Sequence, residues 1–246
     1  MRNCVADNKD TGNYIMVIAG LQKLTLLDFP GKLASTVFTP GCNLRCSYCY
    51  NSNLICSETD KSAEYTPEKV LEFLRKRVGK IDGVCVTGGE PLLQLGIDDF
   101  LSECKGMGLL TKLDTNGTQP EKLEELIKAG LVDHVAVDMK TGFSRYAEYT
   151  GATDSQIQNV KNTVRFLING QVDYEFRTTF SSPHHTRETV DELLFGIKGA
   201  KRYAIQQYRD TETVLERDKN SPPEKEIIEY AKARAEEMGM EVIVRG

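Results

Sequence analysis

Short apolar runs alternate with longer amphipathic stretches along most of this 246-residue chain. The short runs, bounded by Gly, Pro or Asn, predict strands, and an apolar position every three to four residues predicts helices. The expected strands cover residues 33–38, 83–87, 109–114, 132–138, 172–179 and 202–207. The expected helices cover residues 67–78, 96–107, 120–129, 154–169, 187–198 and 222–238.

Regular alternation of strands and helices predicts a parallel sheet with right-handed crossovers. Six such units are too few to close the usual eight-stranded barrel. We therefore expect an α/β fold, a partial (β/α)6 barrel of the TIM type that is open on one side. Residues 15–33 alternate around Gly20 and end in a Pro30-Gly31 turn, which predicts a short hairpin closing one end of the barrel.

The same pattern sets the expected domain limits. Residues 1–19 should form an N-terminal extension and the start of the hairpin, and residues 20–246 a single domain. Thr66 and Pro67 supply a cap and a proline at the first helical position, so a helix should begin there. Ser221 and Glu224 have capping-box spacing before the last helix.

Composition narrows the classes of function. The net charge is −5, with 31 basic and 36 acidic residues interspersed, so no basic field for nucleic acid is expected. No apolar stretch reaches the roughly 20 residues that span a bilayer, and the polar first residues lack a signal-peptide core. The seven cysteines, an odd number, favour a reducing compartment with a metal site. We expect a cytoplasmic protein without membrane contact.

Three of these cysteines fall on one short loop after the strand at 33–38. Cys42, Cys46 and Cys49 have C-x-x-x-C-x-x-C spacing within the sequence GCNLRCSYCYN. Thiolates are the usual ligands of a cubic four-iron cluster, and three of them leave one iron open to a substrate group. The alternative is a closed zinc site with Cys56 as the fourth ligand.

Unusual residues also stand where other strands end, and ligands bind at the carboxyl ends of parallel strands. The strand at 83–87 is followed by Gly88, Gly89 and Glu90; paired glycines allow backbone to approach a ligand, and Glu90 adds an anion. Alone, this would be an ordinary strand-to-helix turn. After a three-cysteine loop, it indicates a binding site.

Further polar residues end the next strands. Asp114 and Thr115 end one strand, Asp138 and Lys140 follow another, and alternation of faces turns Arg177 inward on a third. Arginine is a bidentate partner for a carboxylate, and inward carboxylates suit ribose hydroxyls or a cation. The competing interpretation is an internal ion-pair network among Asp114, Asp138, Lys140 and Arg177.

Other candidates rank lower. His184 and His185 are interpreted as surface residues with a possible substrate contact, and Gln206, Gln207 and Arg209 as residues at the mouth of the barrel. Cys85 and Cys104 are expected to be small core residues, Cys56 a free thiol, and Cys4 has no evident partner.

The cysteine spacing, with Tyr48 directly before the last cysteine, resembles the signature loop of the radical S-adenosylmethionine (SAM) enzymes. The resemblance implies a single [4Fe–4S] cluster on Cys42, Cys46 and Cys49 whose open iron binds the methionine amino and carboxylate groups. One electron then cleaves SAM and forms a 5'-deoxyadenosyl radical. The chain lacks the cysteine-rich insert that some enzymes of this kind carry, so no auxiliary clusters are expected.

The segments GLQKLTLLDFPGK, TPGCNLRCSYCYN, TGGEPLLQ, DTNG, VAVDMK and IQQYR together resemble the glycyl radical enzyme activases. The sequence is most similar to anaerobic ribonucleoside-triphosphate reductase activating proteins, with pyruvate formate-lyase activating enzymes as near relatives. The resemblance implies a glycyl radical enzyme as partner and a flavodoxin or ferredoxin as electron donor.

The resemblance also assigns roles to residues. Tyr48 would lie along the adenine, and Gly88, Gly89 and Glu90 would hold the methionine amino group. Positions near the methionine carboxylate, a cation or the glycine loop would be Asp114, Thr115, Asp138, Lys140 and, aligned less closely, Arg177. Tyr50 replaces a histidine found in many relatives, which leaves it packing against the nucleoside.

Two rival functions are considered. One is a radical SAM enzyme acting on a small molecule, such as a 7-carboxy-7-deazaguanine synthase; the charged segment from Arg209 onward offers little to build its pocket. The other is a zinc-stabilised binding module without catalysis.

Overall fold

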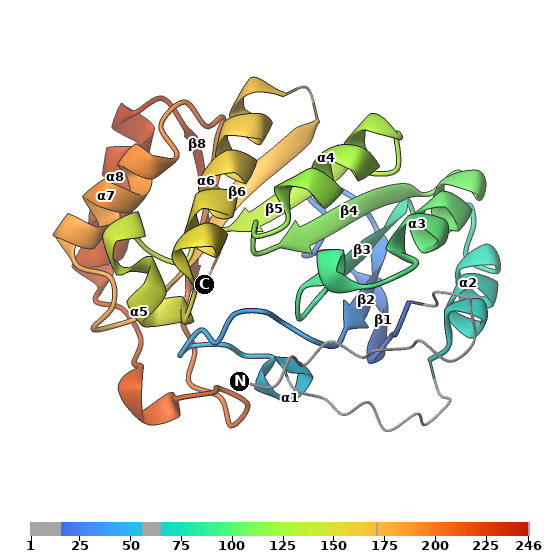
Figure 1. Ribbon diagram of the computed structural model, residues 1–246, viewed down its shortest axis with the longest axis horizontal. Helices are drawn as coiled ribbons and strands as arrows, with labels where there is room; N and C mark the ends of the chain where they lie inside the picture. Colours follow the sequence, from blue (N-terminus) through green and yellow to red (C-terminus); the bar gives the residue numbers. More distant parts are fainter. Residues whose placement is uncertain (1–15, 56–64, 171, 246) are drawn as a thin grey trace. The chain divides into compact units, whose positions relative to one another are not determined.

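The computed structural model describes residues 16–55, 65–170 and 172–245 (Figure 1). The interpretations of Cys4, Cys56 and residues 1–15 lie outside these ranges. Eight strands form one sheet in chain order. They are β1 (Gly20–Thr25), β2 (Ala34–Thr39), β3 (Gly83–Gly88), β4 (Leu110–Thr115), β5 (His134–Asp138), β6 (Asp173–Phe180), β7 (Arg202–Gln207) and β8 (Glu241–Arg245).

Strand pairing follows the expected parallel pattern, with one exception at the edge. β1 pairs antiparallel with β2, whereas β2 and β3, β3 and β4, β6 and β7, and β7 and β8 pair in parallel. In the sheet order of the described strands, β1 and β8 are the two edges, so the sheet is open. The predicted hairpin exists, but its second arm is β2 itself. β8 was not predicted.

The chain divides into two compact units. Of the described residues, the first contains 16–43, 53–55, 65–115 and 121–135, and the second contains 44–52, 116–120, 136–170 and 172–245. Each unit has its own buried apolar residues, such as Val84, Leu101 and Leu113 in the first and Phe176, Leu193 and Ile205 in the second. The prediction of a single domain over residues 20–246 stays a prediction.

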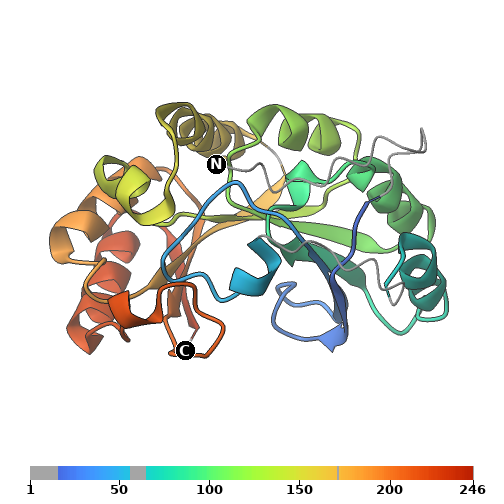
Figure 2. The same cartoon turned by 60° about the horizontal axis from the view of Figure 1, so that its bottom comes forward.

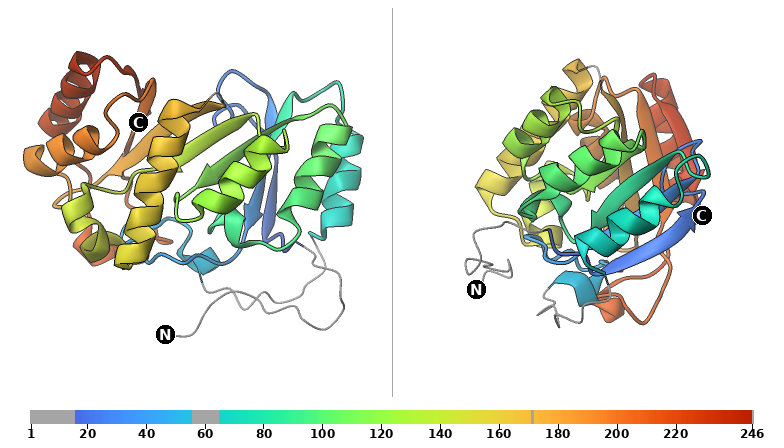
Figure 3. Two further views of the ribbon diagram at one scale, coloured as in Figure 1. Left: turned by 45° about the horizontal axis from the view of Figure 1, so that its top comes forward. Right: turned by 90° about the vertical axis from the view of Figure 1, so that its right-hand side faces the viewer.

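In the first unit, helices cover one face of β3 and β4 (Figure 3). α2 (Pro67–Arg75) begins as predicted, because Thr66 accepts a hydrogen bond from the Lys69 N–H and Pro67 occupies the first position. α3 (Ile97–Gly106) buries Phe100 and Cys104. α4 (Pro120–Lys128) follows β4, and the short α1 (Ser52–Ile55) follows the cysteine loop.

In the second unit, β6, β7 and β8 are connected by α7 (Arg187–Gly196) and α8 (Lys225–Glu237). α6 (Asp154–Asn169) carries a capping box at Thr153, and α5 (Tyr146–Thr150) is one short turn. The capping box predicted at Ser221 does not form. Instead the Ser221 N–H donates to the Ser182 carbonyl, and α8 begins after Pro222 and Pro223, because Glu224 occupies the cap position.

The last strand is held to β6 by a buried ion pair. The Arg245 guanidinium donates two hydrogen bonds to the Glu175 carboxylate, at 3.1 and 2.8 Å, and Glu175 is only 2% exposed. Two hydrogen bonds of this kind make the ion pair strong and directional.

Within the described residues, no helix has the length and apolar character needed to cross a membrane.

Candidate active site

The cysteine loop, residues 41–51, is divided between the two units. Cys42 belongs to the first unit, and Cys46 and Cys49 belong to the second. Cys46 is buried, and Cys42 and Cys49 are half-buried. Across residues 16–55, 65–170 and 172–245, no three Cys, His, Asp or Glu side chains form a ready-made metal group. The three-cysteine cluster site therefore stays a prediction from the spacing.

Main-chain hydrogen bonds fix the part of the loop that carries Cys46 and Cys49. The Cys49 N–H donates to the Cys46 carbonyl at 3.1 Å, which closes a turn between the two thiols. Arg45 N–H donates to the Thr150 carbonyl at the end of α5, at 2.7 Å. Two thiols are thus presented from one hydrogen-bonded turn, a donor set that suits soft metal ions such as iron in a sulfide cluster.

The double glycine packs against the stem of the cysteine loop. The Gly89 N–H donates to the Thr39 carbonyl at 2.8 Å, and the Glu90 N–H donates to the Gly41 carbonyl at 2.7 Å. Gly88 has φ = 119°, and a Cβ there would lie 2.5 Å from the Thr39 backbone. A Cβ on Gly89 would overlap the Gly41 carbonyl oxygen. The glycines are therefore required for backbone packing, whether or not a ligand approaches them.

Replacing Gly89 by alanine is expected to move the loop stem and weaken the protein. Because the clash is with backbone, which cannot rotate away, we expect the free energy of unfolding to fall by about 2 kcal/mol or more. Urea denaturation measures the loss. Gly106→Ala is the control, since a Cβ there has no heavy atom within 4 Å; equal losses in both variants would contradict the packing role.

Glu90 is fully buried and anchored by two donors. Its Oε1 accepts a hydrogen bond from the Leu92 N–H at 3.1 Å and from the Thr115 hydroxyl at 2.7 Å. The first of these caps the short helix at Pro91–Leu93. The structure therefore brings together Glu90 and Thr115, two of the predicted site residues, from the ends of β3 and β4. A fixed, buried carboxylate is a suitable partner for an ammonium group.

Asp114 is paired with Lys112, a residue that the sequence patterns do not mark as part of a site. Lys112, on the same face of β4, is completely buried, and its ammonium group contacts the Asp114 carboxylate. The Cys85 thiol donates to the same carboxylate oxygen at 3.6 Å. Cys85 is buried as predicted, but it belongs to this polar group. A lysine two residues before an inward aspartate is the signal that could have identified the pair.

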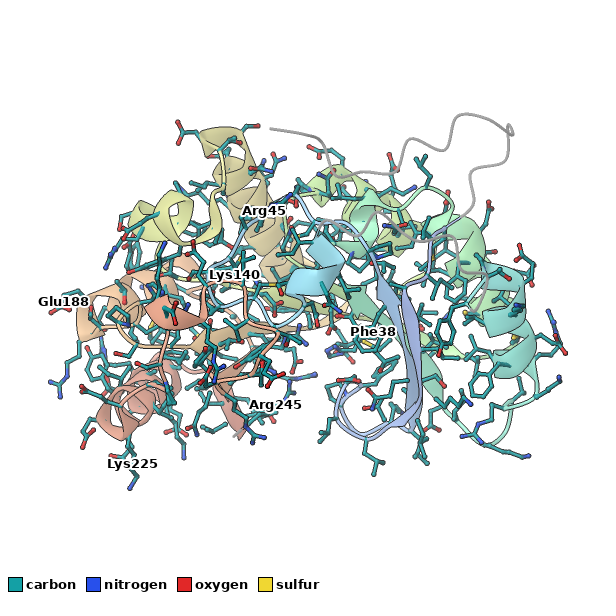
Figure 4. The ribbon with its side chains drawn as sticks, turned by 90° about the horizontal axis from the view of Figure 1, so that it is seen from below. Phe38, Arg45, Lys140, Glu188, Lys225 and Arg245 are labelled. Atoms are coloured by element: carbon teal, nitrogen blue, oxygen red, sulfur yellow. The ribbon has the colours of Figure 1, made fainter. Side chains whose placement is uncertain are left out.

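In the second unit, Asp138 joins the two predicted cations. Its Oδ2 lies 3.1 Å from Lys140 Nζ, and its Oδ1 lies 2.8 Å from Arg177 Nε; Lys140 is labelled in Figure 4. The prediction that Arg177 faces inward is confirmed. The competing ion-pair network forms for these three residues, whereas the ion pair seen for Asp114 is with Lys112. Asp138 thus holds the cationic groups of both Lys140 and Arg177.

Electrostatics keep this trio ionised. Burial acts to raise the pKa of Asp138, but Arg177 and Lys140 outweigh it and hold the pKa well below its ordinary value of 3.8. Burial acts to lower the pKa of Lys140, and the Asp138 carboxylate raises it above its ordinary value. Burial raises the pKa of the Cys49 thiol, and the positive charge of Lys140 opposes this. Burial outweighs Lys140, so the pKa of Cys49 lies above its ordinary value and the thiol is protonated when no metal is bound.

Tyr48 is part of the buried framework of the second unit. It is 3% exposed, and its hydroxyl donates to the Lys140 carbonyl at 2.9 Å. Burial raises its pKa well above 10.0, so the hydroxyl keeps its proton. Tyr48 therefore links the cysteine loop to the turn after β5, and its predicted place along an adenine stays a prediction.

The interpretation of His184 and His185 as surface residues was wrong. They are 8% and 5% exposed. The His184 Nε2 lies 3.2 Å from the Ser47 hydroxyl, and its ring packs edge-on against Tyr149 with centroids 4.2 Å apart. His185 Nδ1 accepts from the Ser181 N–H, and Nε2 lies 3.1 Å from the Lys140 carbonyl. Both rings hold the turns that carry site residues.

His185 makes folding sensitive to acid. Burial lowers its pKa from 6.5 to about 4. The unfolded chain therefore binds a proton between pH 6.5 and 4 that the folded protein does not, so stability falls as pH falls through this range. We expect protonation of His185 to lower the free energy of unfolding by about 3 kcal/mol between pH 6.5 and 4.

Urea denaturation between pH 6.5 and 4 tests this prediction. The His185→Gln variant, which keeps a donor for the Lys140 carbonyl, should lose stability less steeply with acid than the unmodified protein. If the free energy of unfolding fell equally steeply with decreasing pH in both proteins, His185 would be protonated in the folded state as readily as in the unfolded chain, and the prediction would be wrong.

Comparison with known proteins identifies the family. Residues 36–195 match the model of the radical SAM superfamily. A Methanocaldococcus jannaschii protein, provisionally named a glycyl-radical enzyme activating enzyme, is 32% identical over 85% of this chain and 87% of its own length. The pyruvate formate-lyase-activating enzyme of Clostridium pasteurianum is 36% identical over 50% of this chain and 52% of its own. A 7-carboxy-7-deazaguanine synthase of Clostridium acetobutylicum is 28% identical over 58% and 63%.

Solved structures share the fold at low sequence identity. Streptococcus suis SuiB bound to S-adenosylmethionine has a TM-score of 0.65 and 16% identity; the match covers 83% of this chain but only 48% of that one. This chain thus spans about half of that protein. Escherichia coli QueE has a TM-score of 0.54 and 16% identity, with 95% of both chains covered.

The chain belongs to the radical SAM superfamily, a class of enzymes that carries an iron–sulfur cluster and uses SAM. Within that class it belongs with the glycyl-radical enzyme activating enzymes. The predicted fold, an α/β partial barrel with an open sheet, is confirmed, although the sheet has eight strands and not six. The alternative of a zinc-stabilised module without catalysis is wrong, because the family is enzymatic.

Proposed function

We propose that this protein cleaves SAM reductively at a single [4Fe–4S] cluster and generates a glycyl radical on a partner enzyme, an anaerobic ribonucleoside-triphosphate reductase. The observation that carries the proposal is the 32% identity to the M. jannaschii relative over 85% of the chain. A flavodoxin or ferredoxin supplies the electron. The proposed location is the cytoplasm, whose reducing conditions suit cysteine ligands.

The proposed cluster ligands are Cys42, Cys46 and Cys49. These three thiolates would hold the cluster, which would supply the electron that cleaves SAM. The turn between Cys46 and Cys49 holds two of the thiols in place before any metal binds. Metal binding must displace the thiol protons, and the positive charge of Lys140 partly offsets the effect of burial on the pKa of Cys49.

The other predicted residues orient SAM in this proposal. Gly88 and Gly89 allow backbone to approach the methionine amino group, and the buried carboxylate of Glu90 balances its charge. Lys140 and Arg177, which Asp138 holds in place, bind the methionine carboxylate. The remaining SAM contacts are assigned to Tyr48, Tyr50, Asp114 and Thr115.

A second candidate is a 7-carboxy-7-deazaguanine synthase, supported by the C. acetobutylicum relative. That similarity covers 58% of this chain, against 85% for the activating-enzyme relative, so it ranks second. The two functions share cluster chemistry and differ in where the substrate radical resides. A protein-based radical supports the first function, and a small-molecule product supports the second.

The test uses the anaerobically reconstituted, reduced protein. It is mixed with SAM and an anaerobic ribonucleotide reductase, and electron paramagnetic resonance is recorded. We expect an organic doublet on the reductase together with one deoxyadenosine per radical, and no doublet when SAM or reductant is omitted. Deoxyadenosine without any protein radical, with turnover of a deazapurine precursor, would overturn the proposal in favour of the second function.

A further inference from the structure

A segment after β7 lies beside residues 47–52, the second half of the cysteine loop and the start of α1 (Figure 2). This strap, residues 208–219, ends in the short helix Arg217–Lys219. The Glu216 N–H donates to the Ser47 carbonyl at 2.9 Å, and the Leu215 N–H donates to the Cys49 carbonyl at 3.1 Å. The Ser52 hydroxyl donates to the Thr213 carbonyl at 2.5 Å. The main chain on either side of Cys49 is therefore tied to the strap.

Side chains reinforce this contact. Tyr50 stacks on Tyr208 with ring centroids 5.8 Å apart and planes 20° from parallel, and its hydroxyl accepts the Arg209 N–H at 2.5 Å. Val214 packs into the same apolar group as Tyr48 and Tyr208. Tyr50 thus contacts the strap through both its ring and its hydroxyl.

The strap has few anchors beyond these. Tyr208 and Val214 are buried, and every other side chain from 209 to 219 is exposed. Arg217 closes the segment on itself through two hydrogen bonds to Asp210, at 2.5 and 2.6 Å. A segment with little buried apolar surface opens locally at a lower free energy than the whole protein unfolds.

The opposite flank of the loop is held differently. The N–H groups of Arg45 and Ser47 donate to carbonyls of Thr150 and Tyr149 in α5. Tyr149 is buried, and its ring contacts His184, so this flank belongs to the packed body of the unit. On one side the loop is therefore fixed to α5, which is packed in the core of the unit, and on the other side it contacts the strap, which can open locally.

We propose that the strap is a clamp: closed, it holds Cys46 and Cys49 in the conformation that binds the cluster, and its opening governs the entry and loss of iron and sulfide. Val214 and Tyr50 are its positioning residues. This inference rests on the proposed function, because it assumes that these cysteines hold the cluster.

Hydrogen exchange and iron release test the clamp. In the Val214→Ala variant we expect the amides of Leu215 and Glu216 to exchange about tenfold faster, because the strap loses its buried anchor. The reconstituted variant should release iron to a chelator faster by a similar factor. Leu215→Ala is the matched control, since that adjacent side chain is 40% exposed and its main-chain hydrogen bond remains.

A second variant with a smaller change separates the effect on the clamp from a general loss of folding. Tyr50→Phe removes only the hydroxyl that accepts the Arg209 N–H and keeps the ring stack, so a smaller acceleration in the same direction is expected. Faster amide exchange with unchanged iron release in Val214→Ala and Tyr50→Phe would overturn the clamp. Exchange at the unmodified rate in both variants would overturn it as well.

The clamp and the proposed function fail in different ways. The exchange measurement uses the protein without its cluster and needs no activity, so it tests the contact between strap and loop directly. If the reconstituted protein holds zinc and no iron–sulfur cluster, both the proposed function and the clamp's role in cluster retention are overturned, whereas the exchange result still reports the contact itself.

Discussion

A Cys49→Ala variant is expected to lose its capacity to cleave SAM, with a fall of more than about 100-fold in deoxyadenosine formation. Even a change outside the ligand shell of a metal site typically costs 10–100-fold, and here a ligand itself is removed. The reconstituted variant should also contain less iron and sulfide. Chemical analysis of iron and sulfide, with chromatography of deoxyadenosine, measures both effects.

Cys104→Ala is the matched control for this variant. Cys104 is buried in α3, and burial raises the pKa of its thiol to about 12, so it stays protonated and inert. We expect this variant to retain the iron and sulfide content and the SAM cleavage of the unmodified protein. If Cys49→Ala kept full activity, or if Cys104→Ala lost it, the assignment of the cluster ligands would be wrong.

The second large effect is expected for Asp138→Ala. Removing this carboxylate leaves Lys140 and Arg177, 17% and 12% exposed, without the anion between them. Breaking a buried pair in this way costs about 3–5 kcal/mol, and we expect a value near 3 because the Asp138 side chain is 29% exposed. SAM cleavage should fall as well, since both cations lose their orientation.

The stabilising effect of Asp138 should depend on pH in a defined direction. Because the folded-state pKa of Asp138 lies below 3.8, its contribution is complete above that pH and is lost as the pH falls through the folded-state value. The difference in unfolding free energy between the protein and Asp138→Ala should therefore have its maximum value at pH 7.

Asp173→Ala is the control variant. It removes a carboxylate that is 70% exposed and paired with Arg202, so it should change the free energy of unfolding by less than about 0.5 kcal/mol. Equal losses in the two variants would contradict the buried-pair account.

Sequence patterns predicted the elements whose cause is local. The start of α2 follows from Thr66 and Pro67, and the period of apolar residues in α6 places Val160 and Leu167 in the core. β8 was not predicted because Glu241–Arg245 is only five residues long and contains three consecutive apolar residues, so apolar and polar positions do not alternate. Its pairing with β7 depends on a neighbour that is distant in sequence.

Residue types and their positions at strand ends predicted part of the candidate site, but not the contacts between distant segments. Alternation along β6 correctly turned Arg177 inward, because the direction of a strand side chain depends only on local geometry. The burial of His184 and His185 depends on Ser47, Tyr149 and Lys140, which come from three other segments. The pairing of Asp114 with Lys112 required recognition of a buried lysine, a residue type that is normally exposed.

The contact between Gly89 and the Gly41 carbonyl has a consequence for protein engineering. The Gly-Gly-Glu turn donates one main-chain hydrogen bond to Thr39, the last residue of β2, and one to Gly41, the first residue of the cysteine loop. No side chain at Gly89 could absorb a change in length between the two segments. A chimera that imports either segment from a distant homologue should therefore misfit, whereas one that exchanges both segments as a single cassette should assemble.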